Sequence, residues 1–172
     1  MSNITFVDED DNVIGAGTKK EVWEKGIWHR VVRINLLNKE GKLLIAKRSE
    51  TLSSAPGLWE SAAAGHVDEG ESYGEAAARE LKEELGISAP LEEVGKAKSP
   101  DLEEPDKKKN RFHMVYVVRW DGEVNPDPGE ISETRWVTPA ELDQWITRSP
   151  DEFTAGLKLC FHILVEKAIV HP

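Results

Sequence analysis

The sequence has little cysteine, no excess of positive charge and no long apolar run. Cys160 is its only cysteine, so no disulfide can form within the chain, and a reducing, cytoplasmic setting is expected. Lysine and arginine number 22 against 32 aspartates and glutamates, a formal net charge of −10, which argues against nucleic acid or an anionic membrane surface as the main partner. No stretch approaches the roughly 18 consecutive apolar residues of a membrane span. These absences predict a soluble protein.

What the sequence does contain is enough for one packed core. Its 172 residues, 39% of them hydrophobic, predict a single domain over residues 1–172. Ile4–Val7 and Val13–Ile14 flank an acidic turn and are followed by a helical pattern at Lys19–Lys25, which indicates an N-terminal hairpin extension of about residues 1–28. A homodimer is compatible with this composition.

Apolar runs typical of strands recur along the rest of the chain. They predict a mixed sheet with helices packed on it rather than a regular strand–helix alternation, hence an α+β protein or α/β/α sandwich. A Ser-, Pro- and Gly-rich loop is expected at Ser49–Gly57 and a charged loop at Glu103–Asn110. The predicted strands are Val31–Leu37, Leu43–Ala46, Leu91–Ala97, Phe112–Trp120 and Arg135–Val137.

Helix signals are clearest between Ser72 and Leu85. Ser72 and Glu75 fit a capping box, and Gly86 stands where a C-terminal glycine belongs, so this segment is predicted to be a helix. Thr138 begins a second capping box with proline at the first helical position. Apolar residues at helical spacing predict a last helix at about Phe153–Ile169.

Glu80, Glu83 and Glu84 stand at i, i+3 and i+4 of the first predicted helix, so their carboxylates lie within one arc of about 100°. Most glutamate-rich helices simply present a solvated acidic face. Here like charges at these spacings cost about 0.2–0.5 kcal/mol per pair, and no lysine interleaves them on their own side. Clustered hard oxygen ligands are what Mg²⁺ or Mn²⁺ requires, so the spacing favours a metal site.

The segment around this helix resembles the signature box of the Nudix hydrolase family. The matching residues are Gly65, Glu71, Arg79-Glu80-Leu81, Glu83-Glu84 and Gly86-Ile87. The resemblance implies a Nudix fold, with the box helix packed on a mixed β-sheet, and Mg²⁺- or Mn²⁺-dependent hydrolysis of a small-molecule diphosphate. It further implies that Glu80, Glu83, Glu84 and the Gly65 carbonyl are metal ligands, and that Glu71 and Arg79 orient the cluster.

Diphosphate hydrolysis needs neutralisation of developing charge and a water that attacks phosphorus in line. A carboxylate is expected to deprotonate that water, and the family resemblance implies that its identity varies. The candidates in this chain are Glu83 and Glu130, the latter in the loop before Trp136. Glu133 and plain solvent exposure of Glu130 are the competing interpretations.

Pieces outside the box resemble the isopentenyl-diphosphate isomerase-like branch of the family, which contains isomerases and hydrolases. They include Trp28-His29-Arg30, Lys47-Arg48-Ser49, Pro56-Gly57-Leu58-Trp59, Gly65-His66-Val67 and Trp136-Val137-Thr138-Pro139. The resemblance implies a catalytic cysteine at position 64 and glutamates at positions 109 and 111 in an isomerase, but this chain has Ala64, Lys109 and Arg111. Alanine cannot transfer a proton to or from carbon. Hydrolase is therefore favoured over two alternatives, an isomerase and a non-catalytic Nudix-fold binding module.

Phosphate-facing side chains in so acidic a chain are expected among its cations. Lys47, Arg48 and Arg111 are predicted to bind substrate together with His66, whereas the run Lys107–Lys109 is as readily explained as surface charge. His29 and His66 match metal-binding positions of isomerases, and their roles stay open. His113 and His162 are predicted to belong to the core. Trp59 could stack on a base, but a tryptophan on a strand is more often a core residue, which is the prediction for it. The leaving group stays open among a nucleoside diphosphate derivative, an isoprenoid diphosphate and a coenzyme.

Overall fold

A computed structural model describes residues 2–99 and 109–172 of the chain. All but the last two residues of the predicted charged loop Glu103–Asn110 lie outside these ranges, as do Lys107 and Lys108. No helix within the described ranges is both long and apolar enough to cross a membrane.

Two parallel strands form the centre of the sheet. β3 (Trp28–Leu37) pairs with β8 (Arg111–Arg119) along its whole length, from His29 opposite Arg111 to Leu37 opposite Arg119. The other edge of β3 is shared by antiparallel partners, namely β1 (Ile4–Val7), β6 (Ala63–His66) and β4 (Leu43–Arg48). Outer pairings extend the sheet: β2 (Val13–Gly17) on β1, β7 (Glu92–Ser99) on β8, and β5 (Trp59–Ser61) and β9 (Ile131–Val137) on β4. β3 and two of its partners, β6 and β8, each contribute residues to the cleft described below.

The helices begin where side chains satisfy the free backbone amides of their first turn. α1 (Lys19–Lys25), α2 (Tyr73–Leu85) and α3 (Pro139–Arg148) each start with a capping box, built on Thr18, Ser72 and Thr138. Gly86 ends α2 with a φ of 70°, a left-handed conformation that glycine adopts without steric cost. The predicted helices at Lys19–Lys25 and Ser72–Leu85 are thereby confirmed. The last elements are a short 3₁₀ helix η1 (Pro150–Glu152) and α4 (Ala155–Glu166).

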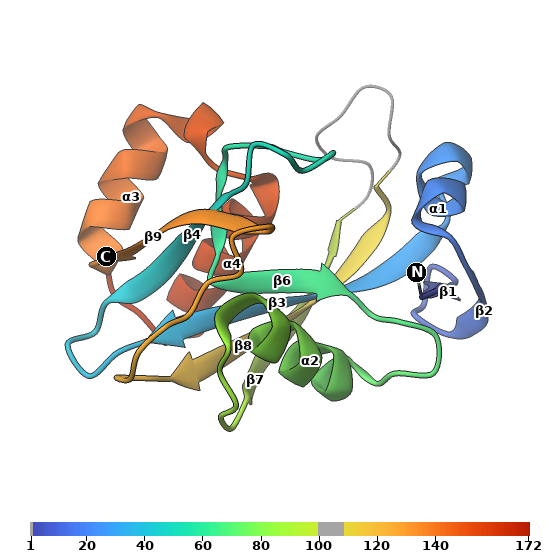
Figure 1. Cartoon of the computed structure of the whole chain (residues 1–172), viewed down its shortest axis with the longest axis horizontal. Helices are drawn as coiled ribbons and strands as arrows, with labels where there is room; N and C mark the ends of the chain where they lie inside the picture. Colours follow the sequence, from blue (N-terminus) through green and yellow to red (C-terminus); the bar gives the residue numbers. More distant parts are fainter. Residues whose placement is uncertain (1, 100–108) are drawn as a thin grey trace.

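The sheet has an apolar core on each face. Val32, Ile34 and Leu36 pack with Leu81 and Leu85 of α2 on one face. On the other face, the alternate side chains of β8 and β4 pack with α4, through Val115, Val117, Ile45, Leu157, Phe161 and Leu164. Figure 1 shows α2 on one side of the central strands and α4 on the other. The predicted α/β/α sandwich is confirmed.

Several predicted boundaries differ from the structure. The last helix starts at Ala155 rather than Phe153, because the Thr154 hydroxyl caps it, and it ends at Glu166. β3 begins at Trp28 and β9 at Ile131, and the short strands β5 and β6 were not predicted. The prediction that His162 belongs to the core is wrong, because its side chain is 68% exposed and pairs with Glu166. His113 and Trp59 are buried as predicted.

Candidate active site

A cleft of about 1170 Å³ opens where α2 and β6 meet α1 and the loop that follows β4. It brings together most of the residues that the sequence singled out. Among the described residues of its lining, lysines and arginines are as numerous as aspartates and glutamates, although the whole chain carries a net charge of −10. The predicted site residues in the lining are Gly65, His66, Arg79, Glu80, Glu83, Glu84, Arg48, Arg111 and Glu130.

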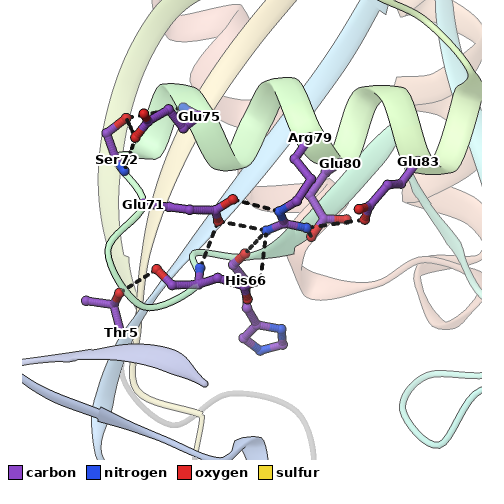
Figure 2. Close-up of polar contacts among 9 residues, drawn as sticks. Thr5, His66, Glu71, Ser72, Glu75, Arg79, Glu80 and Glu83 are labelled. Atoms are coloured by element: carbon purple, nitrogen blue, oxygen red, sulfur yellow. Dashed lines mark hydrogen bonds and ion pairs between the residues drawn. The ribbon is translucent and has the colours of Figure 1, made fainter. Parts of the chain in front are cut away.

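Arg79 is the centre of the hydrogen-bond network on α2 (Figure 2). Its guanidinium donates to both Glu71 oxygens at 2.8 and 2.9 Å and to the His66 carbonyl at 3.0 Å. Nη1 donates to Glu80 Oε1 at 2.7 Å and to Glu83 Oε2 at 3.3 Å. Glu71 also accepts the Asp68 amide at 2.9 Å. These contacts tie α2 to the turn after β6, so the structure brings Glu71 and Arg79 together with Glu80 and Glu83.

Glu80 and Glu84 are carboxylates crowded into a poorly solvated place. Burial, then the charges of Glu80 and Glu130, raises the pKa of Glu84 well above its usual range. Burial also raises the pKa of Glu80, with the charge of Glu83 adding to it, although Arg79 opposes the shift. A cation beside these groups would relieve both the burial penalty and the repulsion. The electrostatics therefore fit a bound divalent cation.

Gly65 supplies the space that the cluster needs. A Cβ at this position would collide with the Glu80 carboxylate in its present place, so glycine lets the β6 backbone approach Glu80 this closely. Within the described residues, no group of His, Cys, Asp and Glu side chains is gathered as a finished coordination sphere. Glu80 and Glu83 are instead turned toward Arg79. The donor types fit Mg²⁺ or Mn²⁺, and their side chains would have to turn to bind it.

The two candidates for the general base come from different elements, and both line the cleft. Glu83 projects from α2 with a side chain that is 61% exposed. Glu130 lies in the loop before β9, lines the cleft and acts electrostatically on Glu84. Its rival Glu133 does not line the cleft and forms an ion pair with Arg135 at 2.8 Å. Asp127, which the sequence did not single out, also lines the cleft.

The predicted substrate-binding cations separate into two groups. Arg111 is buried at the start of β8 and lines the cleft. Arg48 also lines it, and its guanidinium donates to the carbonyls of Ser54 and Ala55 at 2.9–3.2 Å, so it braces the loop. Lys47 is not part of the described lining. Because side chains alternate along a strand, Lys47 lies on the opposite face of β4 from Ala46 and Arg48, and the structure separates it from the site.

Sequence reasoning missed a buried ion pair at the floor of the cleft. Arg33 Nη1 lies 2.6 Å from Glu60 Oε2, and their side chains are only 6% and 8% exposed. The Thr154 hydroxyl donates to the same Glu60 oxygen at 2.8 Å, and Arg33 Nε donates to His113 Nδ1 at 3.1 Å. Burial alone would raise the pKa of Glu60, but the Arg33 charge and the hydrogen bonds from Ser61, Arg33 and Thr154 together outweigh burial, and the pKa is lowered. The sequence signal for this pair is Arg33, a charged residue within the apolar run Val31–Leu37.

Neutral histidines lie beneath this part of the cleft. His29 stacks on His66, with ring centroids 5.4 Å apart. Burial lowers the pKa of His29 to about 4, and burial followed by the charge effect of His29 lowers the pKa of His66 well below its usual range. His29 Nδ1 contacts the Ile27 carbonyl at 3.1 Å. Both rings are therefore uncharged at neutral pH, and His66 offers the cleft a polar but neutral edge.

Comparison with known proteins agrees with this architecture. The sequence model of the NUDIX domain matches residues 27–157. An isopentenyl-diphosphate Delta-isomerase of Serratia proteamaculans is 34% identical, over 88% of this chain and 84% of the isomerase. An uncharacterized Nudix hydrolase of Pseudomonas aeruginosa is 38% identical, over 79% of this chain and 78% of its own. The crystal structure of DR0079 from Deinococcus radiodurans superimposes with a TM-score of 0.73 and 28% identity, covering 94% of this chain and 96% of that one. The chain belongs to the Nudix family.

Proposed function

We propose that this protein is a Mg²⁺- or Mn²⁺-dependent diphosphatase that hydrolyses a nucleoside-diphosphate-type or related small molecule. The observation that carries the proposal is the pair Glu80 and Glu84, whose pKa values are raised by burial and like charge in a cleft that also holds Arg48 and Arg111. Carboxylates held in this way suit a divalent cation, and the cations suit phosphate oxygens.

The residues of the site then have four roles, and Glu83 is a candidate for two of them. Glu80, Glu83, Glu84 and the Gly65 carbonyl would hold Mg²⁺ or Mn²⁺, which when bound neutralises charge that develops on the diphosphate. Glu71 and Arg79 keep the α2 carboxylates facing β6. Glu83 or Glu130 takes the proton from the attacking water, which must approach phosphorus in line with the leaving oxygen. Arg48, Arg111 and His66 contact the substrate.

The isomerase names among the relatives favour a second candidate, isopentenyl-diphosphate Delta-isomerase. Isomerisation requires a proton donor and a proton acceptor on opposite faces of the carbon skeleton. Ala64 and Arg111 line the cleft at positions where the resemblance implies a cysteine and a glutamate. The Ala64 methyl group transfers no proton, and an arginine guanidinium stays protonated. These residues favour hydrolysis.

A non-catalytic ligand-binding module is the third candidate. Such a module has no need of Glu80, Glu83 and Glu84 together, and this chain retains all three. Tight nucleotide binding without turnover, with either metal, would favour the module over the enzyme.

The decisive experiment is a screen of the purified protein against nucleoside diphosphates, nucleotide sugars, coenzymes and isoprenoid diphosphates with Mg²⁺ or Mn²⁺. Products are followed by ³¹P NMR. Isopentenyl diphosphate is incubated in parallel in heavy water. Diphosphate cleavage without deuterium incorporation into carbon supports the proposal, whereas steady deuterium incorporation would establish isomerase activity and overturn it.

A further inference from the structure

The part of the cleft contributed by α1 and the loop after β4 has a different character from the glutamate cluster. Its lining includes Trp23, Leu52 and Ala55, together with Ser54 and Lys109. Figure 1 shows α1 at the edge of the molecule, apart from α2. The cleft therefore continues from the carboxylates toward an aromatic and hydroxyl-bearing region. α1 precedes the segment matched by the NUDIX sequence model.

Trp23 is half-buried and held by a rigid support. Its neighbour Val22 is fully buried, which fixes the roll of α1. The Asn110 amide donates to the Gly26 carbonyl at 2.8 Å and so joins the end of α1 to the start of β8. Lys109 Nζ lies 5.9 Å from the centre of the Trp23 ring and donates to the Ser54 hydroxyl at 2.9 Å. The indole is thus positioned by contacts that link three segments of the chain.

The dimensions and chemistry of this region indicate which class of ligand it binds. A volume of about 1170 Å³ exceeds the roughly 300–1,000 Å³ of typical small-molecule sites, and a diphosphate with a small leaving group would leave much of it vacant. Ser54 and Lys109 hydrogen-bond to each other at 2.9 Å, and an isoprenoid tail would cover this polar pair with hydrocarbon that offers it no polar atom. A planar group with polar edges can stack on the indole and also present polar atoms to this pair.

We propose that Trp23 is the stacking platform for the base of a nucleoside diphosphate substrate whose diphosphate reaches the α2 glutamates. This deepens the proposed function and rests on it for the position of the diphosphate. Base stacking acts on the substrate before and during the reaction alike, so Trp23 sets KM rather than kcat.

The kinetic test compares Trp23→Leu and Trp23→Phe with the unchanged protein. Trp23→Leu is expected to raise KM for a nucleoside diphosphate by about 5- to 100-fold, the range of base stacking, with kcat retained. KM for methyl diphosphate is expected to stay unchanged, and Trp23→Phe to keep most of the affinity. Trp28→Leu is the matched control, because Trp28 is also half-buried but packs on Phe112 at 5.3 Å, outside the described cleft lining. An equal rise in KM for both substrates, or none for the nucleotide, would overturn the proposal.

A binding measurement separates this proposal from hydrolysis itself. A nucleoside methylenediphosphonate, which cannot be cleaved at the bridge, is titrated while tryptophan fluorescence is recorded. Quenching that is lost in Trp23→Phe supports the base subsite even if the protein hydrolyses none of the screened compounds. Quenching that persists unchanged in Trp23→Phe overturns the subsite, whatever the protein hydrolyses.

Discussion

The Glu80 carboxylate occupies the space that any side chain larger than hydrogen at residue 65 would need. Glu80 is held in this place by Arg79 at 2.7 Å, and Arg79 is in turn held by Glu71. The glycine and the glutamate therefore form one unit of the site, although they lie on different elements.

Gly65→Ala is expected to displace the Glu80 carboxylate and lower kcat/KM on the best substrate by about 10- to 100-fold, because misplacing a catalytic group by about 1 Å has effects of this size. The flexible glutamate can move, so the fold should be retained. Gly74→Ala is the matched control, since a Cβ there meets nothing within 4 Å and alanine favours a helix by about 0.5–1 kcal/mol. Unchanged activity in Gly65→Ala would contradict the unit described above.

Glu83→Gln is expected to lower kcat by at least about 10²-fold, because an amide neither accepts a proton from water nor neutralises a cation. Steady-state kinetics with saturating Mg²⁺ and Mn²⁺ measure the effect. Glu75→Gln is the control on the same helix: Glu75 belongs to the capping box with Ser72, and glutamine preserves that role. Equal turnover by Glu83→Gln and the unchanged protein would refute the metal-site interpretation.

Glu84→Gln is expected to abolish activity and yet stabilise the metal-free protein at pH 7.5. The raised pKa of Glu84 means that its ionised form opposes folding, by about 1.4 kcal/mol for every tenfold loss of acidity on folding. This penalty is absent below the unfolded pKa of about 4.3 and grows as pH rises toward the folded pKa. Thermal unfolding in EDTA and in Mn²⁺ measures both effects. The midpoint should rise on substitution in EDTA, and Mn²⁺ should stabilise only the unchanged protein.

Acid is expected to destabilise the fold through its buried histidines. The pKa of His29 falls from 6.5 to about 4 on folding, so between these values the unfolded chain binds more protons and stability decreases as pH is lowered, by up to about 3 kcal/mol. Urea unfolding at intervals from pH 7.5 to 4.5 should show a shallower loss for His29→Gln. His162→Gln, at an exposed position, should keep the original slope. Identical slopes for all three proteins would exclude His29 as a source of the acid sensitivity.

Glu60→Gln is expected to destabilise the protein by about 3–5 kcal/mol, because it leaves the Arg33 guanidinium buried without its counter-charge. Glu133→Gln breaks an ion pair whose partners are 49% and 44% exposed and should change stability by less than about 1 kcal/mol. Chemical denaturation at pH 7.5 gives both values. A loss below about 1 kcal/mol for Glu60→Gln would mean that Arg33 is solvated in the native protein.

Local signals predicted much of this molecule, and long-range contacts account for what they missed. The capping box at Ser72 and the glycine at 86 act within a few residues, so α2 was predicted to within one residue of its boundaries. α1 was predicted from the pattern of Lys19–Lys25, and its Thr18 cap is equally local. β6 contains alanines, which favour helix, and it is extended because Ala63–His66 pair with β3. The ion pair of Arg33 with Glu60 and the place of Trp23 in the cleft depend on partners that no nearby pattern identifies.

The parallel pairing of β3 with β8 has a consequence for synthesis of the chain. Residues 28–37 need residues 111–119 as neighbours, and the intervening chain must be made first. At about 5–20 residues per second, the ribosome completes β8 roughly 4–16 s after β3. During this interval one edge of an apolar strand stays unpaired and open to chaperones or to other nascent chains, and the cleft floor that Arg33 and His113 share cannot yet exist.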